Sequence, residues 1–102
     1  MVKPKGLRIE WTLMAKDDFK SILFYYKKRS PKGYSLVKEA VLENIKQAAR
    51  APIIFNWDTL KSPKDINVRA FTVYHTRVSY RIERDRLVVL RLRHTSREPK
   101  EY

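Results

Sequence analysis

The side chains best suited to chemistry on phosphate lie near the end of this sequence. Arg77 opens one strand-like segment, His94 and Arg97 follow the next, and Tyr102 closes the chain. An arginine fork grips phosphate oxygens at two points and never loses its charge. Histidine exchanges a proton near neutral pH, whereas Tyr102 could act as a base only if neighbouring arginines lowered its pKa from about 10. These residue types favour a site that binds a polyanion.

The overall charge indicates the same kind of partner. Lys and Arg number 23 against 11 Asp and Glu, which gives a formal net charge of +12. Such a surplus opposes compaction through self-repulsion, so a partner is expected to use it. The candidates are a phosphate backbone, an anionic membrane or an acidic protein, and the plain alternative is solubility.

Several classes of site and location are disfavoured. The chain has no cysteine, and His75 and His94 are far apart in the sequence, so neither a disulfide nor a metal site is expected. Nothing in the sequence calls for a cofactor. No apolar run approaches the roughly 18 residues of a membrane span, and the N-terminus lacks an apolar signal core, so a cytoplasmic protein is predicted.

The first half of the chain predicts a strand and two helices. Residues 7–12 alternate like a half-buried strand, and apolar residues recur at helical spacing over about 13–29. The "SPKG" stretch at 30–33 favours a tight turn. A second amphipathic helix begins near Tyr34 and ends near residue 51, because Pro52 disfavours helix before it. Residues 52–66 show no period and are expected to form a loop.

The second half predicts three strands in succession. They cover 67–75, 77–83 and 86–93, and Arg84-Asp85 makes a two-residue turn between the last two. Short connections imply antiparallel pairing. The fold class is therefore α+β: one domain over 1–102, in the order β-α-α-β-β-β, with the helical hairpin packed on one face of an antiparallel sheet.

Alternation also assigns side chains to faces. In 77–83 and 86–93 the predicted core residues are Val78, Tyr80, Ile82, Val88, Leu90 and Leu92. The opposite face is then open and basic, with Arg77, Arg81, Arg91 and Arg93 as candidate nucleic-acid contacts. Arg69 is a further candidate nucleic-acid contact; it shares its face with Phe71 and Val73 and is expected near the sheet edge. Lys61 and Lys64, in the loop, are further candidates for contact with an RNA backbone, or plain solvated lysines.

Two long stretches resemble the RelE/ParE superfamily of type II toxins. "IEWTLMAKDDFKSILFYY" looks like the opening of that family, and "RVSYRIERDRLVVLRLRHTSREP" looks like its final hairpin and tail. The resemblance covers nearly the whole chain. It implies a small toxin that an acidic cognate antitoxin neutralises. The superfamily is split: RelE-like members cut mRNA in the ribosomal A site, whereas ParE-like members act on DNA gyrase and are not nucleases.

The RelE-like branch implies roles for four residues. Arg77 matches the strand arginine at the scissile phosphate, Arg97 matches an arginine of the tail, and Tyr102 lies close to the catalytic tyrosine. In this metal-free reaction the ribose 2′-hydroxyl attacks the adjacent phosphate, which requires a base, cations and an acid. His94 is the acid–base candidate on intrinsic grounds, although ParE-like sequences carry a similar histidine without nuclease chemistry. A frayed tail is the alternative for Tyr102.

Three functions follow from these observations. The charge favours a ribosome-dependent mRNA endonuclease that inhibits translation, with the ribosome and mRNA as partners. The first alternative is a gyrase inhibitor without nuclease activity, favoured by the ParE-like opening and tail. The second alternative is a basic nucleic-acid-binding module that catalyses nothing.

Overall fold

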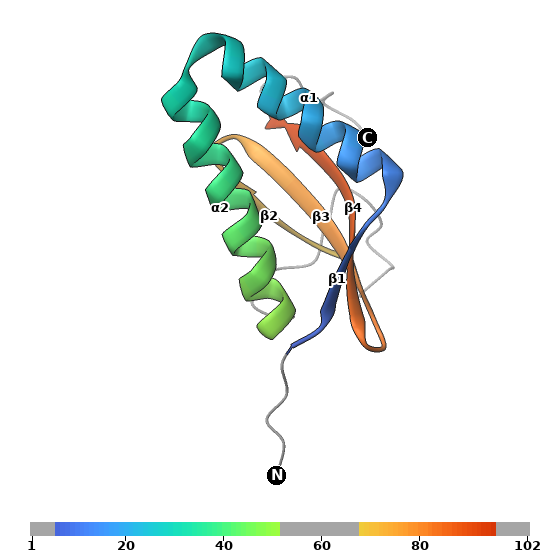
Figure 1. The fold of residues 1–102 in the computed structure, drawn as a ribbon. Coiled ribbons are helices and arrows are strands. Elements are labelled where there is room, and N and C mark those ends of the chain that lie inside the picture. Colours follow the sequence, from blue (N-terminus) through green and yellow to red (C-terminus); the bar gives the residue numbers. More distant parts are fainter. Residues whose placement is uncertain (1–5, 52–67, 96–102) are drawn as a thin grey trace.

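The chain forms two helices and four strands in the predicted order. The computed structural model describes residues 6–51 and 68–95, so the expected loop at 52–66 lies outside the described residues. The elements are β1 (Arg8–Trp11), α1 (Leu13–Arg29), α2 (Pro31–Arg50), β2 (Val68–Val73), β3 (Thr76–Glu83) and β4 (Arg86–His94). The helical hairpin lies over one face of the sheet (Figure 1), which confirms the α+β class and the predicted arrangement.

Helix α1 is fixed at its start by Thr12. The Thr12 hydroxyl accepts a hydrogen bond from the Ala15 N–H at 3.0 Å, which satisfies one of the amide groups left free at a helix N-terminus. The same hydroxyl donates to the Leu90 carbonyl of β4 at 2.9 Å. Thr12 therefore caps the helix and ties it to the sheet.

The predicted turn at 30–33 is wrong, because only Ser30 separates the helices. The Ser30 N–H donates to the Tyr26 carbonyl and so ends α1, while its hydroxyl accepts from the Gly33 N–H at 3.0 Å and so begins α2. Pro31 is the first residue of α2, a position where its missing N–H costs nothing. The proline was therefore a helix-start signal and not a turn signal.

Replacing this shared cap should weaken the helical hairpin measurably. We expect Ser30→Ala to lower the free energy of unfolding by about 1 kcal/mol, because the Gly33 N–H loses its acceptor. Urea denaturation followed by circular dichroism measures the change. Ser35→Ala, at an exposed position inside α2, is the matched control and should change stability by less than about 0.5 kcal/mol. Equal effects of both substitutions would show that the cap contributes nothing.

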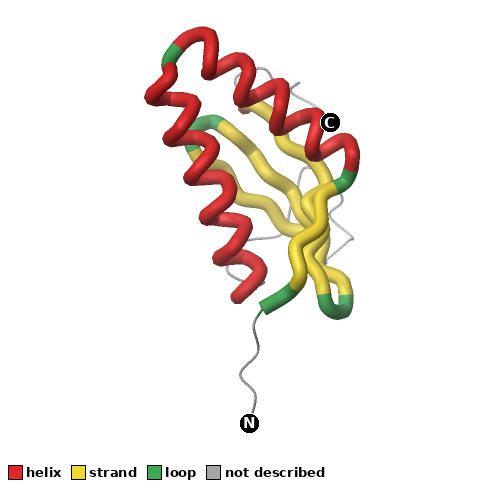
Figure 2. Tube along the Cα trace, in the orientation of Figure 1, coloured by secondary structure: helices red, strands yellow, loops and turns green. Residues whose placement is uncertain are grey.

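The sheet is mixed, and this corrects the expectation that all strands are antiparallel. Its order is β1-β4-β3-β2, with β2 and β3 antiparallel and β3 and β4 antiparallel. Strand β1 instead runs parallel to β4, with Arg8 opposite Arg86 and Trp11 opposite Val89. Figure 2 shows the two strands side by side at one edge of the sheet.

The helical hairpin explains the parallel pair. Two antiparallel helices of similar length return the chain to the end where β1 begins, and the Leu7 N–H donates to the Ala49 carbonyl there at 2.9 Å. Gly6 permits this approach, because its φ is +91° and a Cβ would lie 2.9 Å from the Ala49 oxygen. Strand β2 therefore starts from the same end of the sheet as β1 and runs in the same direction. Because β3 is antiparallel to both β2 and β4, β4 also runs in this direction and pairs in parallel with β1.

A bulge in β4 reverses part of the predicted face assignment. Ser79 lies opposite Arg91 but the next residue, Tyr80, lies opposite Val89, so Leu90 is the extra residue. Leu87 and Val89 are consequently fully buried, whereas Val88 and Leu90 are only partly buried. The prediction of Val88 and Leu90 as core residues was wrong, because strict alternation cannot show an inserted residue.

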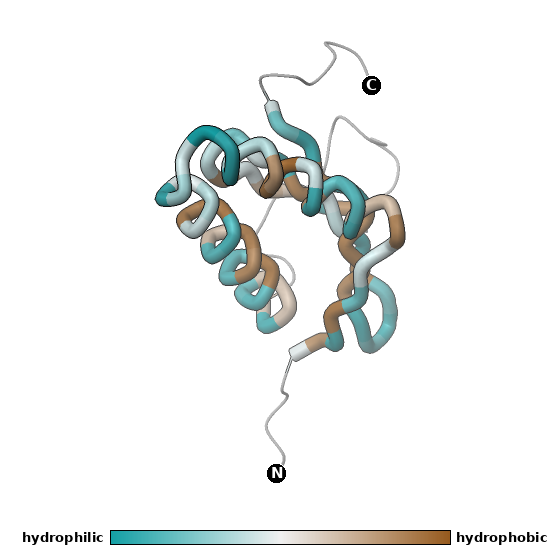
Figure 3. Tube along the Cα trace, turned by 45° about the horizontal axis from the view of Figure 1, so that its top comes forward, coloured by the Kyte–Doolittle hydropathy of each residue, from teal (hydrophilic) through white to brown (hydrophobic). Residues whose placement is uncertain are grey.

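The core lies between the helices and the sheet. Helix α2 supplies Val37, Val41, Ile45 and Ala48 to this core. Hydrophobic and hydrophilic positions alternate along the helix (Figure 3), as expected for the amphipathic helix that the sequence predicted. Tyr80 of the central strand β3 is fully buried, as predicted, with its ring 6.4 Å from that of Phe71. No helix in the described part of the chain is both long enough and apolar enough to span a membrane.

Candidate functional site

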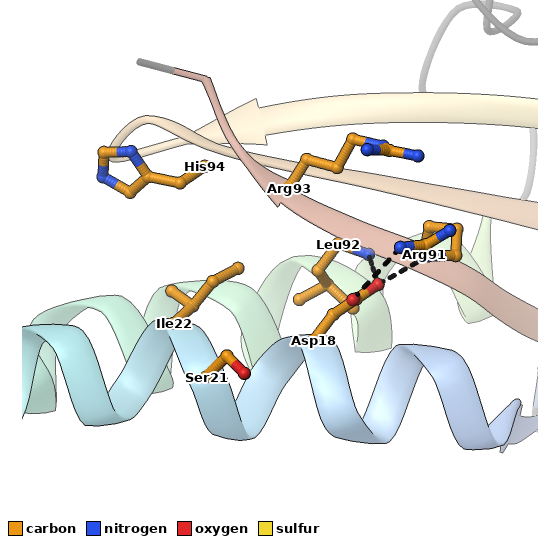
Figure 4. Close-up of a pocket in the computed structure, with 7 residues that line it drawn as sticks. All are labelled: Asp18, Ser21, Ile22, Arg91, Leu92, Arg93 and His94. Atoms are coloured by element: carbon orange, nitrogen blue, oxygen red, sulfur yellow. Dashed lines mark hydrogen bonds and ion pairs between the residues drawn. The ribbon is translucent and has the colours of Figure 1, made fainter. Parts of the chain in front are cut away.

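Two arginines lie side by side on the sheet face that points away from the helices. Arg77 of β3 is directly opposite Arg93 of β4, and their sequence neighbours Val78 and Leu92 point into the core. Arg93 projects away from α1 in Figure 4. Adjacent guanidinium groups on one rigid surface suit the oxygens of a phosphate or carboxylate. The predicted outward placement of both residues is confirmed.

The centre of this outer face is not bare, which corrects the prediction of an open basic groove. Val68 and Ser79 point outward by alternation from the core residues Phe71 and Val78, yet they are only 3% exposed. Arg81, opposite Val68, is half-buried. Alternation gives the side on which a residue lies, but it does not show whether other groups cover that side.

Arg91 is held by a carboxylate of α1. Its Nε donates to Oδ2 of Asp18 at 2.7 Å and a terminal nitrogen donates to Oδ1 at 3.3 Å (Figure 4). The same Oδ2 accepts the Leu92 backbone N–H at 3.0 Å. Strand β1 ends at Trp11, opposite Val89, so Asp18 satisfies a backbone group of β4 beyond the end of β1. Arg91 therefore has a structural partner, whereas it was predicted as a nucleic-acid contact.

His94 lies on the helix side of the sheet and not beside Arg77. It follows the outward-facing Arg93 and is opposite the fully buried Thr76, so its ring turns toward α1. Its Nε2 is 3.0 Å from the Tyr26 hydroxyl. The structure thus separates two residues that were predicted to act together, because neighbouring residues of a strand point to opposite faces.

The rings around His94 form an aromatic cluster that the sequence did not predict. The centroids of Tyr25 and His75 lie 5.3 and 6.2 Å from that of His94, and the guanidinium carbon of Arg29 lies 3.9 Å from the centre of the Tyr25 ring. Burial, and secondly the neighbouring Tyr25, raises the pKa of Tyr26, so its hydroxyl stays protonated. Tyr26 was not among the predicted site residues. Its spacing of four from the buried Ile22 placed it on the inner side of α1, but not next to a histidine.

The remaining predicted residues divide into two groups. Arg69 lies opposite Tyr80 on the helix side of the edge strand β2, as its shared face with Phe71 and Val73 indicated, and so apart from Arg77 and Arg93. The others lie outside the described residues: Lys61, Lys64, Arg97 and Tyr102.

The chemistry open to the described residues is limited. The hollow between α1 and β4 is lined by the Asp18–Arg91 pair and also by Arg93 and His94 (Figure 4). Its volume of about 200 Å³ is small for a nucleotide-sized ligand. Within 6–51 and 68–95 no three His, Asp or Glu side chains come together as metal ligands would. On the outer face lie the half-buried guanidinium groups of Arg77 and Arg93, while the ring of His94 contacts Tyr26 on the helix side.

Comparison with known proteins gives a family and several structural relatives. The sequence model of the family described as the ParE toxin of the type II toxin-antitoxin system, parDE, matches residues 9–99. Among curated proteins none matches the chain in sequence.

Solved toxin structures share the fold. The chromosomal ParDE system from P. aeruginosa is 17% identical with a TM-score of 0.70, and the match covers 88% of this chain and 97% of that one. The RelBE2 toxin-antitoxin complex from Mycobacterium tuberculosis is 19% identical with a TM-score of 0.58, covering 90% and 94%. The YoeB/ParE toxin from Agrobacterium tumefaciens is 20% identical with a TM-score of 0.59, covering 86% and 98%. At such identities the likeness establishes the fold.

Proposed function

Because this chain belongs to the ParE toxin family of type II toxin–antitoxin systems, we propose that it arrests growth by binding DNA gyrase and not by cutting mRNA. Gyrase is the target that the resemblance to ParE-like members implies. The proposed activity requires a surface that binds and inhibits, and it requires no acid or base. A toxin of this kind acts in the cytoplasm, where its target lies.

The observation that carries the proposal is the position of His94. Cleavage by the 2′-hydroxyl requires a base, a cation and an acid around one phosphate. In the described residues the Arg77–Arg93 pair lies on one face of the sheet, while the imidazole of His94 contacts Tyr26 on the other. This arrangement supports a binding function over a catalytic one.

The proposal is tested with purified components. We expect the protein to inhibit supercoiling by gyrase, or to trap its cleavage complex, at close to stoichiometric concentration. In a translating extract, primer extension should show no new mRNA ends. His94→Ala should leave gyrase inhibition within about twofold of wild type, because this proposal gives the imidazole no chemical role. New mRNA ends together with unaffected gyrase would refute the proposal.

The ribosome-dependent endonuclease is the second candidate, and the paired arginines favour it. Arg77 and Arg93 lie directly opposite each other and could bind one scissile phosphate between them. This alternative predicts that Arg77→Ala lowers the rate of mRNA cleavage by roughly 10²- to 10³-fold, as expected for the loss of one group that stabilises transition-state charge. The gyrase proposal predicts no cleavage in either protein.

A cognate antitoxin is the proposed physiological partner. The related ParDE and RelBE2 structures are toxin–antitoxin systems, and a net charge of +12 suits an acidic binding protein. Such a partner would neutralise the toxin by covering the surface that engages the target.

A further inference from the structure

The turn between β2 and β3 holds two bulky residues in a backbone conformation that favours glycine. Val73 pairs with Thr76, so only Tyr74 and His75 connect the strands, and their φ angles are +49° and +62°. Two-residue hairpins with positive φ at both positions are usually built from Asn-Gly or Asp-Gly. A tyrosine in this region is a genuine outlier, and such strain is concentrated at functional sites.

This turn is tied to the rest of the fold through its backbone, and the His75 ring also lies 6.2 Å from that of His94. Both residues are exposed, with Tyr74 at 53%, and both are fixed through their backbone carbonyls. The Tyr26 hydroxyl donates to the Tyr74 carbonyl at 3.3 Å, and the Thr95 N–H donates to the His75 carbonyl at 2.7 Å. Any residue would provide these carbonyls. The turn therefore holds the exposed side chains of Tyr74 and His75 on a fixed backbone, and this backbone is strained by its positive φ angles.

The surroundings of the turn have the character of a protein-binding site. An open groove of about 570 Å³ runs from α2 to Tyr74. Its apolar lining is Leu36, Ala40 and Leu42, and its charged lining is Glu39, Glu43 and Lys46. The basic last turn of α1, which ends in Lys27, Lys28 and Arg29, also lies near this turn, since the Tyr26 hydroxyl contacts the Tyr74 carbonyl. An exposed tyrosine beside apolar side chains, with charged groups of both signs around them, resembles the apolar centre and polar rim of protein interfaces.

We infer that the Tyr74–His75 turn is the anchor by which this protein docks on gyrase, at a site with an apolar pocket and a charged rim. The inference rests on the proposed function. A protein partner fits better than single-stranded nucleic acid, which requires successive open rings for base stacking. Here the guanidinium of Arg29 covers the nearby Tyr25 ring. Preorganisation by the two backbone hydrogen bonds reduces the entropy lost on docking.

The test separates side-chain function from backbone strain. The double variant Tyr74→Asn/His75→Gly places favoured residues in the turn, so its Tm should rise by about 5 °C. Its inhibition of gyrase supercoiling should nevertheless fall at least tenfold. Arg84→Ala is the matched control: it alters the two-residue turn at the opposite end of the sheet, where the structure has no positive φ, and removes one exposed cation. It should inhibit gyrase like wild type.

Each other outcome decides against the inference. Full inhibition by a stabilised double variant would show that the turn does not contact gyrase. A lower Tm with lost inhibition would show that its side chains serve folding. An equal loss of binding to labelled oligothymidine would assign the turn to nucleic acid. Wild-type protein that leaves gyrase unaffected would refute the proposed function, whereas equal inhibition by wild type and double variant refutes only this inference.

Discussion

Asp18→Ala should lower the free energy of unfolding by about 3 kcal/mol. The substitution removes the acceptor of the Leu92 N–H and leaves the guanidinium of Arg91, whose side chain is 25% exposed, without its carboxylate. An unsatisfied backbone donor costs about 1–3 kcal/mol, and a largely buried charge that loses its partner adds to this. Urea denaturation of both proteins measures the difference.

Two further variants resolve the contributions of Asp18. Asp18→Asn keeps an oxygen that can accept from Leu92 but loses the charge, so about half of the destabilisation should remain. Asp17→Ala removes an adjacent, exposed carboxylate and should cost less than about 0.5 kcal/mol. If Asp18→Ala were no more damaging than Asp17→Ala, the ion pair and the backbone contact would have no energetic role.

Alkaline pH should destabilise the protein through Tyr80. Burial raises the pKa of Tyr80 from 10.0 to about 12, and the positive charge of Arg69 opposes this shift. Between these values the unfolded chain releases the phenol proton while the folded protein keeps it. Stability is therefore intact below pH 10 and is lost as pH rises towards 12. The loss amounts to about 2–3 kcal/mol, at 1.36 kcal/mol for each unit of pKa.

Tyr80→Phe isolates this effect from other alkaline titrations. The variant has no phenol proton, so the stability difference between wild type and variant should shrink by about 2–3 kcal/mol from pH 9 to pH 12. Chemical denaturation at a series of pH values provides both curves. Parallel curves would mean that Tyr80 titrates alike in the folded and unfolded states.

Periodicity predicted most of the fold because each element has one buried side. Apolar residues at helical spacing predicted a helix over about 13–29, and these are the observed bounds of α1. The alternating segments 77–83 and 86–93 correspond to β3 and β4, with ends that differ by one residue. The missed details depend on contacts between distant segments. The parallel direction of β1 follows from where α2 returns the chain, and the bulge at Leu90 is visible only against the partner strand.

The candidate site was predictable only in part, for the same reason. Alternation placed Arg77 and Arg93 together on the outer face. It could not predict the ion pair between Arg91 and Asp18, which are 73 positions apart in the sequence. Nor could it predict the contact between Tyr26 and His94, which are 68 positions apart. The resemblance identified the toxin class, and membership of a toxin family removes the reason for a harmless nucleic-acid-binding module. The separation of His94 from Arg77 is the observation on which the proposal of gyrase as the target rests.

The pairing of β1 with β4 also bears on how the toxin is made. The paired residues Arg8 and Arg86 are 78 positions apart. Strand β1 is synthesised early but can pair only after β4 has been synthesised. Contacts between such distant positions form slowly, because a long loop must close before they contribute. During synthesis there is therefore an interval in which most of the chain has been made while the sheet is still incomplete, because β1 lacks its partner strand β4.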